Sequence, residues 1–421
     1  MTNRDKTKSY EISKREVYSA WLRVRKNGGG AGVDGVNIVD FEINLSKNLY
    51  KLWNRMSSGS YFPQAVKRVE IPKPDGGKRP LGIPTIYDRV AQEVVRARLE
   101  PMVEPCFVKD SYGFRPEKSA QDAVQKCRSR NFRYDWAIDL DISKYFDTID
   151  HELLMKAVEH HCSCKWMLLY ITRWLKAPIK NAEGEEWSNA TGTPQGGVIS
   201  PLLSNLYLHY VFDTWFKRQK WSAEFERFAD DIVVHCESRD VAEEILNRII
   251  ERFAECNLSV NTNKTRLVYC KDEYRREEVD VAKNFDFLGF TFRARRLTQR
   301  SGKIISRFLP SASRKAKKKL RKRVKRIINN KNHRLSLAEL NKILTPIIRG
   351  WHNYFKTFST ANDFSDIWWY LQRKISVWLK RKYQKNISKV GKWMQRIRKI
   401  DPRLLIHWQL AYNYDWTRRA V

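Results

Sequence analysis

The stretch ERFADDIVVHC, residues 226–236, places two adjacent aspartates, Asp230 and Asp231, between apolar segments that have the composition of β-strands. Aspartate is disfavoured in strands, and burying an unpaired carboxylate is costly. Taken alone, the stretch is best explained as a surface turn between two strands. The rest of the chain has to show whether these carboxylates have a further role.

The composition indicates a large and strongly basic chain. Its 421 residues exceed one ordinary domain, so we expect two or three. Lys and Arg number 80 against 47 Asp and Glu, a formal net charge of +33. Such a charge favours a polyanionic partner, with nucleic acid ahead of an anionic membrane surface. We find no apolar run long enough for a bilayer and no signal-peptide pattern, so we expect a cytoplasmic protein without a membrane partner.

The seven cysteines are scattered and odd in number, which favours reduced thiols. HHCSC at 160–164 could suggest zinc, but it lacks a second ligand pair at a usual spacing. A helix end with buried thiols explains it better.

Several segments have the periodicity of regular structure. Residues 66–84, VKRVEIPKPDGGKRPLGIP, indicate a hairpin with a Pro-Asp-Gly-Gly turn. The opening stretch indicates a second hairpin, and NFDFLGFTF at 284–292 ends the β-rich middle. We expect helices within 10–26, from about 88 to 104, within 151–178, after 200 and over 239–257.

The segment YDWAIDLDISKYFDTIDH, residues 134–151, begins as a strand. Its apolar side chains from Ile138 to Ile142 fall on one face, while Asp139 and Asp141 fall on the other. The middle of the chain therefore carries acidic side chains on more than one expected strand.

The composition becomes strongly basic after about residue 310. Between Arg314 and Arg326, ten of thirteen residues are Lys or Arg; the exceptions are Ala316, Leu320 and Val324, each four apart. A solvated face is the usual interpretation of such a run. An apolar stripe on an otherwise basic helix is better explained by docking on a core, with the remainder facing phosphates. The chain after this helix is expected to be helical.

The carboxylates that we expect on strands are those of Asp139, Asp141, Asp230 and Asp231. Phosphoryl transfer commonly uses two Mg²⁺ ions roughly 3.5–4 Å apart, and Mg²⁺ prefers oxygen ligands. One aspartate on a strand and a pair on a neighbouring hairpin would make such a site. The bound metals would balance the buried charge.

Two further features fit a nucleotide substrate. Lys73 and Arg79 flank the turn of the first hairpin, where both could reach a triphosphate. Pro194-Gln195-Gly196-Gly197 precedes a helical pattern, and its glycines allow the backbone to approach a ligand closely.

The motifs along the chain are very specific in combination. In order, they are GAGVDG, IPKPDGGKRPLGIPTIYDRVAQ, SYGFRPEKSAQDAV, DLDISKYFDTIDH, GTPQGGVISPLLSNLYL, FADD, LSVNTNKTR, FLGF and LTPIIRGWHNYF. The chain resembles the reverse transcriptase–maturase family encoded by group II introns, without the HNH endonuclease domain. The resemblance runs nearly end to end and implies an α/β plus all-α fold: a right-hand polymerase with an antiparallel sheet in fingers and palm and a helical thumb.

The resemblance also implies four segments. These are an N-terminal extension with fingers at 1–130, a palm with some fingers elements at 131–305, a thumb or maturase domain at 306–383, and a short basic segment like a DNA-binding domain at 384–421.

The catalytic residues implied by the resemblance are Asp141, Asp230 and Asp231. In the family motif an aromatic residue stands five positions after the first aspartate; Phe146 therefore selects Asp141 over Asp139. The metal set adds Ile142 to the three aspartates and holds two Mg²⁺ ions. Asp139, Asp147 and Asp150 are then expected to be structural or solvated.

The nucleotide-binding residues implied by the resemblance are Lys73, Arg79, Phe146, Gln195, Ala229 and Lys264. Phe146 resembles the steric gate against a 2′-hydroxyl, and Gln195 resembles a residue that packs at the nascent base pair. Lys264 resembles a palm lysine near the leaving pyrophosphate, although a surface lysine is an equal alternative. The family usually has Tyr where this chain has Phe228, a loss that the packed ring should tolerate.

The residues implied to contact template or RNA are Arg115, Lys317, Lys318, Arg321, Lys322 and Lys325. A structural salt bridge is the alternative for Arg115. FLGF resembles the primer grip; as an apolar strand it also fits simple core packing, and the two roles are compatible. For Trp351 and Tyr354 in the thumb we favour packing over contact.

The function implied by the resemblance is RNA-directed DNA synthesis by the reverse transcriptase of a mobile group II intron. The same protein would act as a maturase in splicing and retromobility. Its partners would be the intron RNA, an RNA template with a DNA primer, target DNA and dNTPs. One alternative is a splicing cofactor whose polymerase is incidental; another is a domesticated relative in phage defence, CRISPR spacer acquisition or DNA repair. No cysteine follows Trp351, so we expect no Cys-ligated zinc endonuclease.

Overall fold

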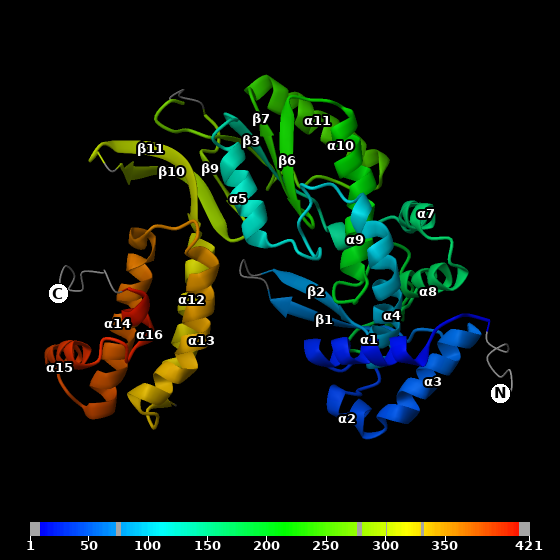
Figure 1. Cartoon of the computed structure of the whole chain (residues 1–421), viewed down its shortest axis with the longest axis horizontal. Coiled ribbons are helices and arrows are strands. Elements are labelled where there is room, and N and C mark those ends of the chain that lie inside the picture. The colour runs from blue at the N-terminus through cyan, green and yellow to red at the C-terminus, as the bar shows by residue number, and fades with distance from the viewer. Residues whose placement is uncertain (1–8, 73–76, 276–279, 300, 330–331, 412–421) are drawn as a thin grey trace. The chain divides into compact units, whose positions relative to one another are not determined.

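The computed structural model describes residues 9–72, 77–275, 280–299, 301–329 and 332–411. It divides into two compact units, each with its own core (Figure 1). Unit 1 comprises Met1–Ala123 and Leu140–Arg266, and unit 2 comprises Val124–Asp139 and Leu267–Val421.

Helices form the N-terminal part of unit 1. They are α1 (Lys14–Asn27), α2 (Ile38–Ile43), α3 (Leu45–Ser58) and α4 (Ile86–Val103). α1 begins at a capping box in which Ser13 and Glu16 satisfy each other's backbone N–H groups. Its buried residues, including Trp21, lie on one face, with which α1 packs against α3 and α4.

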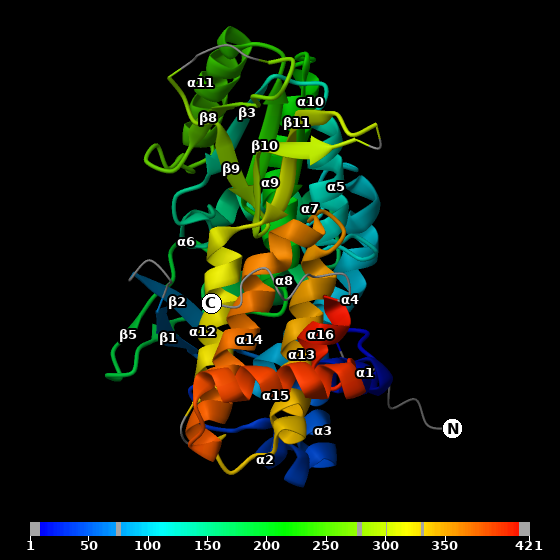
Figure 2. The same ribbon diagram turned by 90° about the vertical axis from the view of Figure 1, so that its left-hand side faces the viewer.

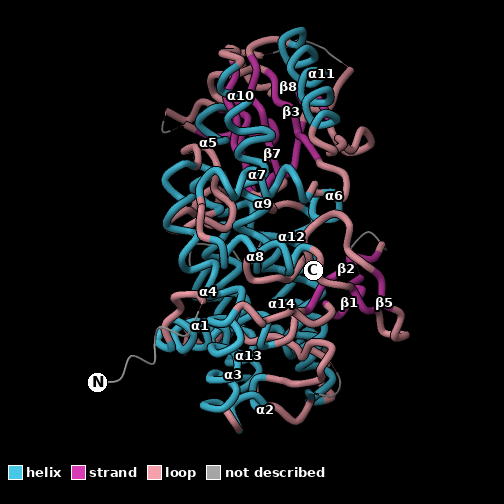
Figure 3. The backbone as a smooth tube through the Cα atoms, turned by 90° about the vertical axis from the view of Figure 1, so that its right-hand side faces the viewer, coloured by secondary structure: helices cyan, strands magenta, loops and turns pink. Residues whose placement is uncertain are grey.

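The first expected hairpin is confirmed. β1 (Val66–Pro72) pairs antiparallel with β2 (Lys78–Ile83), and the turn between them lies outside the described residues. β4 (Ile179–Lys180) and β5 (Glu186–Trp187) extend it to a sheet of order β2-β1-β4-β5. Figure 3 shows β1, β2 and β5 together in magenta.

The second expected hairpin is also confirmed. β6 (Ala223–Phe228) pairs antiparallel with β7 (Asp231–Cys236), and the sheet order is β6-β7-β3-β8, with β3 at Trp136–Asp141 and β8 at Arg266–Tyr269. Ile232, Val233 and Val234 are fully buried, as the apolar run of the opening stretch requires. α11 (Arg239–Glu255) packs on β7 (Figure 1).

The remaining helices of this region connect the strands. They are η2 (Glu104–Cys106), α5 (Ala120–Arg130), α6 (Tyr145–Thr148), α7 (His151–His161), α8 (Lys165–Leu175), α9 (Ser200–Leu208), the π-helix η3 (His209–Asp213) and α10 (Thr214–Arg218).

A three-stranded antiparallel sheet of order β11-β10-β9 belongs to unit 2: β9 (Asn284–Phe287), β10 (Phe290–Thr298) and β11 (Ile304–Ala312). Leu288 and Gly289 form the two-residue β9–β10 turn, with φ of 50° and 81°, as tight hairpins require. Phe287 and Phe290 beside this turn are fully buried. The FLGF segment thus contributes to the core of unit 2, which is one of the two compatible roles expected of it.

Five helices complete unit 2: α12 (Arg314–Ile327), α13 (Leu337–Phe355), α14 (Ala361–Tyr383), α15 (Ile387–Ile400) and α16 (Ile406–Leu410). On α12 the expected stripe is buried at Leu320 and Val324, and the helix packs against α13 and α14. Figure 2 shows α15 running across the direction of α12 and α14. The α/β plus all-α architecture is confirmed.

Two expectations from the composition concern the state of the cysteines and membrane-spanning helices. All seven cysteines lie within the described residues and are free thiols. In the described parts of the chain, none of the helices combines the length and the apolar character needed to cross a membrane.

Phe290 is the residue of unit 2 whose truncation we expect to be most damaging. Its ring packs on Tyr354, Phe355 and Phe358, with centroids 5.5, 4.8 and 5.6 Å away. Phe290→Ala should lower the free energy of opening of unit 2 by about 3–5 kcal/mol, measured by hydrogen exchange of the α13 amides in the full chain. Ile304→Ala, at a position 65% exposed in β11, is the control and should change it by less than about 0.5 kcal/mol. If the two variants changed the free energy of opening equally, the core role assigned to Phe290 would be contradicted.

Candidate active site

The FADD segment is a tight turn at the end of β6 and β7. Phe228 pairs with Asp231, the first residue of β7, so Ala229 and Asp230 form the turn itself. The expectation that Asp230 lies on a strand is wrong, because the chain reverses within two residues. Ala229 has a φ of 57°, and a Cβ on Gly113 would lie 2.3 Å from the Ala229 nitrogen. Only glycine allows the segment around Gly113 to lie this close to the turn.

Asp141 ends β3, the strand next to β7. The Asp141 N–H donates to Thr265 Oγ1 (3.1 Å), and its carbonyl accepts from the Asn261 N–H (2.8 Å). Ile142 follows in an isolated bridge with Val260. The backbone around Asp141 is therefore held on both sides by the LSVNTNKTR segment.

The Asp230 carboxyl lies in surroundings that oppose its ionisation. Burial raises the pKa of its carboxyl, and the nearby Asp141 carboxylate raises it further, whereas Arg79 and Arg227 lower it. The Lys264 Nζ lies 3.4 Å from Asp141 Oδ2, with both side chains partly exposed. Asp141 and Asp230 thus act on each other as like charges, and cations lie near each of them.

The PQGG segment lies against the first hairpin. Arg79 Nε donates to Gln195 Oε1 (2.7 Å), and the Gly82 N–H donates to the Gln195 carbonyl (2.9 Å). Gly196 has a φ of 132°, and a Cβ there would lie 2.3 Å from the Gly82 oxygen. The glycine is needed both for its backbone conformation and for the close approach.

Phe146, on α6, is connected to the same segment. Its carbonyl accepts from the Thr193 N–H at 2.7 Å, two residues before Gln195. Lys73, the other residue expected to bind the triphosphate, lies outside the described residues.

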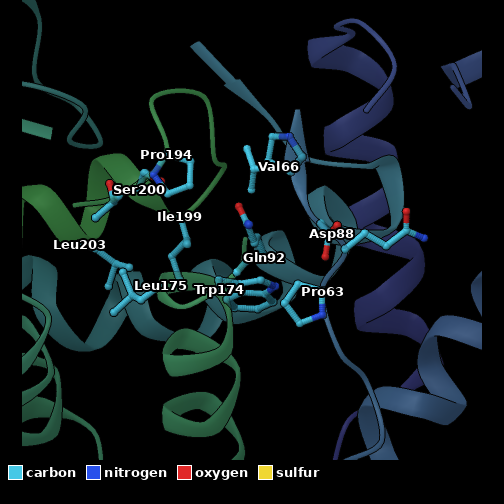
Figure 4. Close-up of a pocket in the computed structure, with 14 residues that line it drawn as sticks. Pro63, Val66, Asp88, Gln92, Trp174, Leu175, Pro194, Ile199, Ser200 and Leu203 are labelled. Atoms are coloured by element: carbon cyan, nitrogen blue, oxygen red, sulfur yellow. The ribbon is translucent and has the colours of Figure 1, made fainter. Parts of the chain in front are cut away.

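A small cavity behind the PQGG segment contains buried polar groups (Figure 4). Gln92 Oε1 accepts from the Val198 N–H (2.7 Å) and so ties α4 to the segment. The Asp88 carboxylate accepts from Thr85 Oγ1 (2.6 Å) and from the Tyr61 hydroxyl. Burial raises the pKa of Asp88 to about 6. The support of this loop therefore includes a buried acid that titrates near neutral pH.

Arg115 is used internally. Its guanidinium pairs with Glu104 Oε1 at 2.7 Å and donates to the carbonyls of Val108 (2.7 Å) and Ser111 (2.8 Å). The side chain is only 7% exposed. This geometry favours the structural salt bridge over the template contact.

The basic residues expected on α12 divide into two groups. Lys317 and Arg321 pair with Asp366 on α14, at 3.0 and 2.7 Å, so they lie toward the thumb core. The exposed residues are Lys318, Lys322 and Lys325.

Trp351, Tyr354 and Phe228 pack as expected. Trp351 lies 4.9 Å from the Phe355 ring, and Tyr354 is 5.5 Å from Phe290. The Phe228 ring is 6.2 Å from that of Phe114.

One buried charge near the site was not anticipated. Arg227, directly before FADD, is 0% exposed. The sequence did contain a signal for it. Arg227 stands in a hairpin strand whose pattern indicates burial, and a buried cation needs partners.

The match to a known family defines this chain as a polymerase that copies a nucleic-acid template. Residues 71–292 match the family "Reverse transcriptase (RNA-dependent DNA polymerase)", and residues 317–399 match "Group II intron, maturase-specific domain". The chain belongs to the reverse transcriptase family and carries a group II intron maturase domain. It is an RNA-directed DNA polymerase of the kind that depends on a divalent metal.

Several known proteins are similar to this chain. Protein YkfC of Escherichia coli (strain K12) is 32% identical over an alignment of 303 residues that covers 62% of this chain and 79% of that protein. The group II intron-encoded protein LtrA of Lactococcus lactis subsp. cremoris is 38% identical over 196 residues, 46% of this chain but only 32% of LtrA. The telomerase of Candida albicans, at 12% identity, aligns with a TM-score of 0.45 over 84% of this chain and 66% of that one.

The buried Asp88 should make stability depend on pH. Because its folded pKa of about 6 is above the ordinary value of 3.8, its contribution is fully present below pH 3.8 and is lost as the pH rises through 6. The free energy of unfolding of the wild type, minus that of Asp88→Asn, should fall by on the order of 1–3 kcal/mol over this window. Urea unfolding of both full chains from pH 4 to 7 measures this difference. Parallel curves would show that Asp88 does not titrate there.

Proposed function

We propose that this chain is the reverse transcriptase of a mobile group II intron, and that it binds the intron RNA as a maturase in splicing and retromobility. The single observation that carries the catalytic part is the meeting of Asp141, at the end of β3, with the Asp230–Asp231 turn of the neighbouring β7. We assign the metal-binding role to these three aspartates and to the Ile142 carbonyl. The four-segment organisation expected from the sequence is part of the proposal, as is action on nucleic acid in the cytoplasm.

The donor set suits two Mg²⁺ ions. All of its ligands are oxygen atoms, which Mg²⁺ prefers. Burial and the Asp141 charge oppose ionisation of Asp230, so divalent cations would favour the ionised form. When bound, such ions neutralise the triphosphate and favour loss of the proton from the primer 3′-hydroxyl.

The chain's own residues would hold the nucleotide for in-line attack. The primer 3′-oxygen forms a bond to the α-phosphorus while the bond to the leaving pyrophosphate breaks. We assign triphosphate binding to Arg79, which Gln195 orients through the 2.7 Å hydrogen bond, and to Lys73. Lys264 is a candidate to donate a proton to the pyrophosphate. The Phe146 ring would exclude a 2′-hydroxyl, and Ala229 would lie beside the nucleotide.

The polymerase site is tested by removing its paired carboxylates. The Asp230→Ala, Asp231→Ala double variant should lose primer extension on an RNA template by at least about a thousandfold, because charge stabilisation worth several kcal/mol is lost. Asp147→Ala removes an exposed carboxylate on nearby α6 and should extend normally. Thermal unfolding verifies that both variants fold. If the folded double variant still extended the primer, the site assignment would be wrong.

RNA binding is expected to use the exposed face of α12, opposite the buried Leu320 and Val324. Changing three of its exposed lysines, Lys318, Lys322 and Lys325, to Ala should weaken binding of structured intron RNA and reduce the slope of log affinity against log salt by up to about 3. The matched control changes the same lysines to Arg and should keep the slope. An unchanged slope in the Ala variant would exclude this face.

The double aspartate variant also separates the two proposed roles. It should still support splicing of the candidate intron RNA, because it retains the basic face of α12.

A further inference from the structure

A buried ion pair lies directly behind the FADD turn. Arg227 Nε and Nη2 donate to the two carboxylate oxygens of Asp213, at 2.7 and 2.6 Å. Both side chains are 0% exposed. This bidentate geometry compensates for removing both charges from water.

The third guanidinium nitrogen reaches the turn itself. Arg227 Nη1 donates to the Ala229 carbonyl (3.0 Å) and to Asn205 Oδ1 (2.9 Å). Ala229 has the left-handed φ of 57°, a conformation that residues with a Cβ adopt only at a cost. Since Ala229 immediately precedes Asp230, the hydrogen bond restrains the peptide from which the Asp230 side chain departs.

The same network holds the opposite side of the turn. Asn205 Nδ2 donates to the Gly113 carbonyl (2.6 Å), and Gly113 lies directly against the Ala229 nitrogen. The strand is also fixed, because the Arg227 N–H donates to the Asp110 carbonyl (2.9 Å) and its own carbonyl accepts from the Tyr112 N–H (2.8 Å). The Arg227 guanidinium thus connects α9 and η3 to a single peptide of the turn. The Asn205 side chain and the Arg227 backbone hold the segment from Asp110 to Gly113.

We propose that Arg227 is a positioning residue: with Asp213 and Asn205 it sets the direction of the Asp230 carboxylate and thereby the metal affinity of the polymerase site. The inference rests on the proposed metal-binding role of Asp230. Arg227 itself is buried, so it would act on the metal through the Ala229 peptide and not by direct contact. Partners that orient ligands in this way commonly change metal affinity by about 10–100-fold when altered.

If Arg227 had only a structural role, a different result would be expected. The β6–β7 hairpin contains a matched control for this comparison. Glu226 and His235 pair at 2.6 Å and are also 0% exposed. Glu226 neighbours Arg227 along β6, so the two side chains point to opposite faces of the sheet. Disturbing Glu226 should destabilise the hairpin without acting on the Ala229 peptide.

The test compares Arg227→Lys with Glu226→Gln in the full chain bound to primer and template. Mn²⁺ binding is followed by electron paramagnetic resonance, and only binding that the Asp230→Ala, Asp231→Ala variant lacks is counted. Arg227→Lys keeps the charge but loses the planar fork, so Mn²⁺ should bind about 10–100-fold more weakly. kcat should fall while KM for dNTP stays within about twofold. Glu226→Gln should lower the unfolding temperature and leave Mn²⁺ affinity within about twofold.

Two outcomes overturn the inference: wild-type Mn²⁺ affinity in Arg227→Lys, or an equal loss in Glu226→Gln. If Arg227→Lys does not fold, Asn205→Ser replaces it, since that change leaves the Arg227–Asp213 pair in place. Asn205→Ser should weaken Mn²⁺ binding about 3–10-fold, and unchanged Mn²⁺ binding would again overturn the inference. If the double aspartate variant is inactive and these affinities are unchanged, only this inference fails; if that variant is active, the proposed site itself fails.

Discussion

The main constraint on unit 1 is that two carboxylates, those of Asp141 and Asp230, must lie close together although they carry like charges. Asp141 and Asp230 belong to neighbouring parts of one sheet, and burial and mutual repulsion both oppose ionisation of Asp230. The surrounding protein offsets this with cations, since Arg79 and Arg227 both favour the charged form and Lys264 pairs with Asp141. A site built in this way suits divalent ions, because it presents oxygen ligands whose negative charge is only partly compensated.

Close backbone contacts at glycine bring the parts of the site together. Gly113 allows its segment to lie against the FADD turn, and Gly196 allows the PQGG segment to lie against Gly82 of β2. Neither approach leaves room for a Cβ. Hydrogen bonds from Arg79 and Gly82 to Gln195 then link nucleotide-binding candidates that are more than one hundred residues apart. The site is therefore assembled from short contacts between rigid elements, which is what precise positioning requires.

Local patterns in the sequence predicted most of the elements. Alternation identified both hairpins, and helical periodicity identified α4, α11 and α12, because each of these elements buries one face and exposes the other. The same patterns do not reveal which partner a charged side chain takes, whether that partner is near in sequence or distant. Arg115 has the character of a nucleic-acid contact, yet Glu104 and two backbone carbonyls occupy its guanidinium. On α12, periodicity separated the apolar stripe from the basic remainder but could not reveal that Asp366 engages Lys317 and Arg321.

The sequence by itself predicted the hairpins and the main helices, because strand and helix periodicity are encoded locally. The order of its motifs, through the family resemblance, indicated the class of fold and the candidate acidic cluster. Only the tertiary structure decided that Asp230 stands in the turn and not on a strand, since this depends on where the antiparallel register ends. It alone also revealed that Asp213 and Asn205 converge on Arg227 behind that turn. The Arg227 guanidinium pairs with side chains 14 and 22 residues away along the chain. Such pairing leaves no periodic signal in the sequence, because tertiary packing and not residue spacing determines the partners.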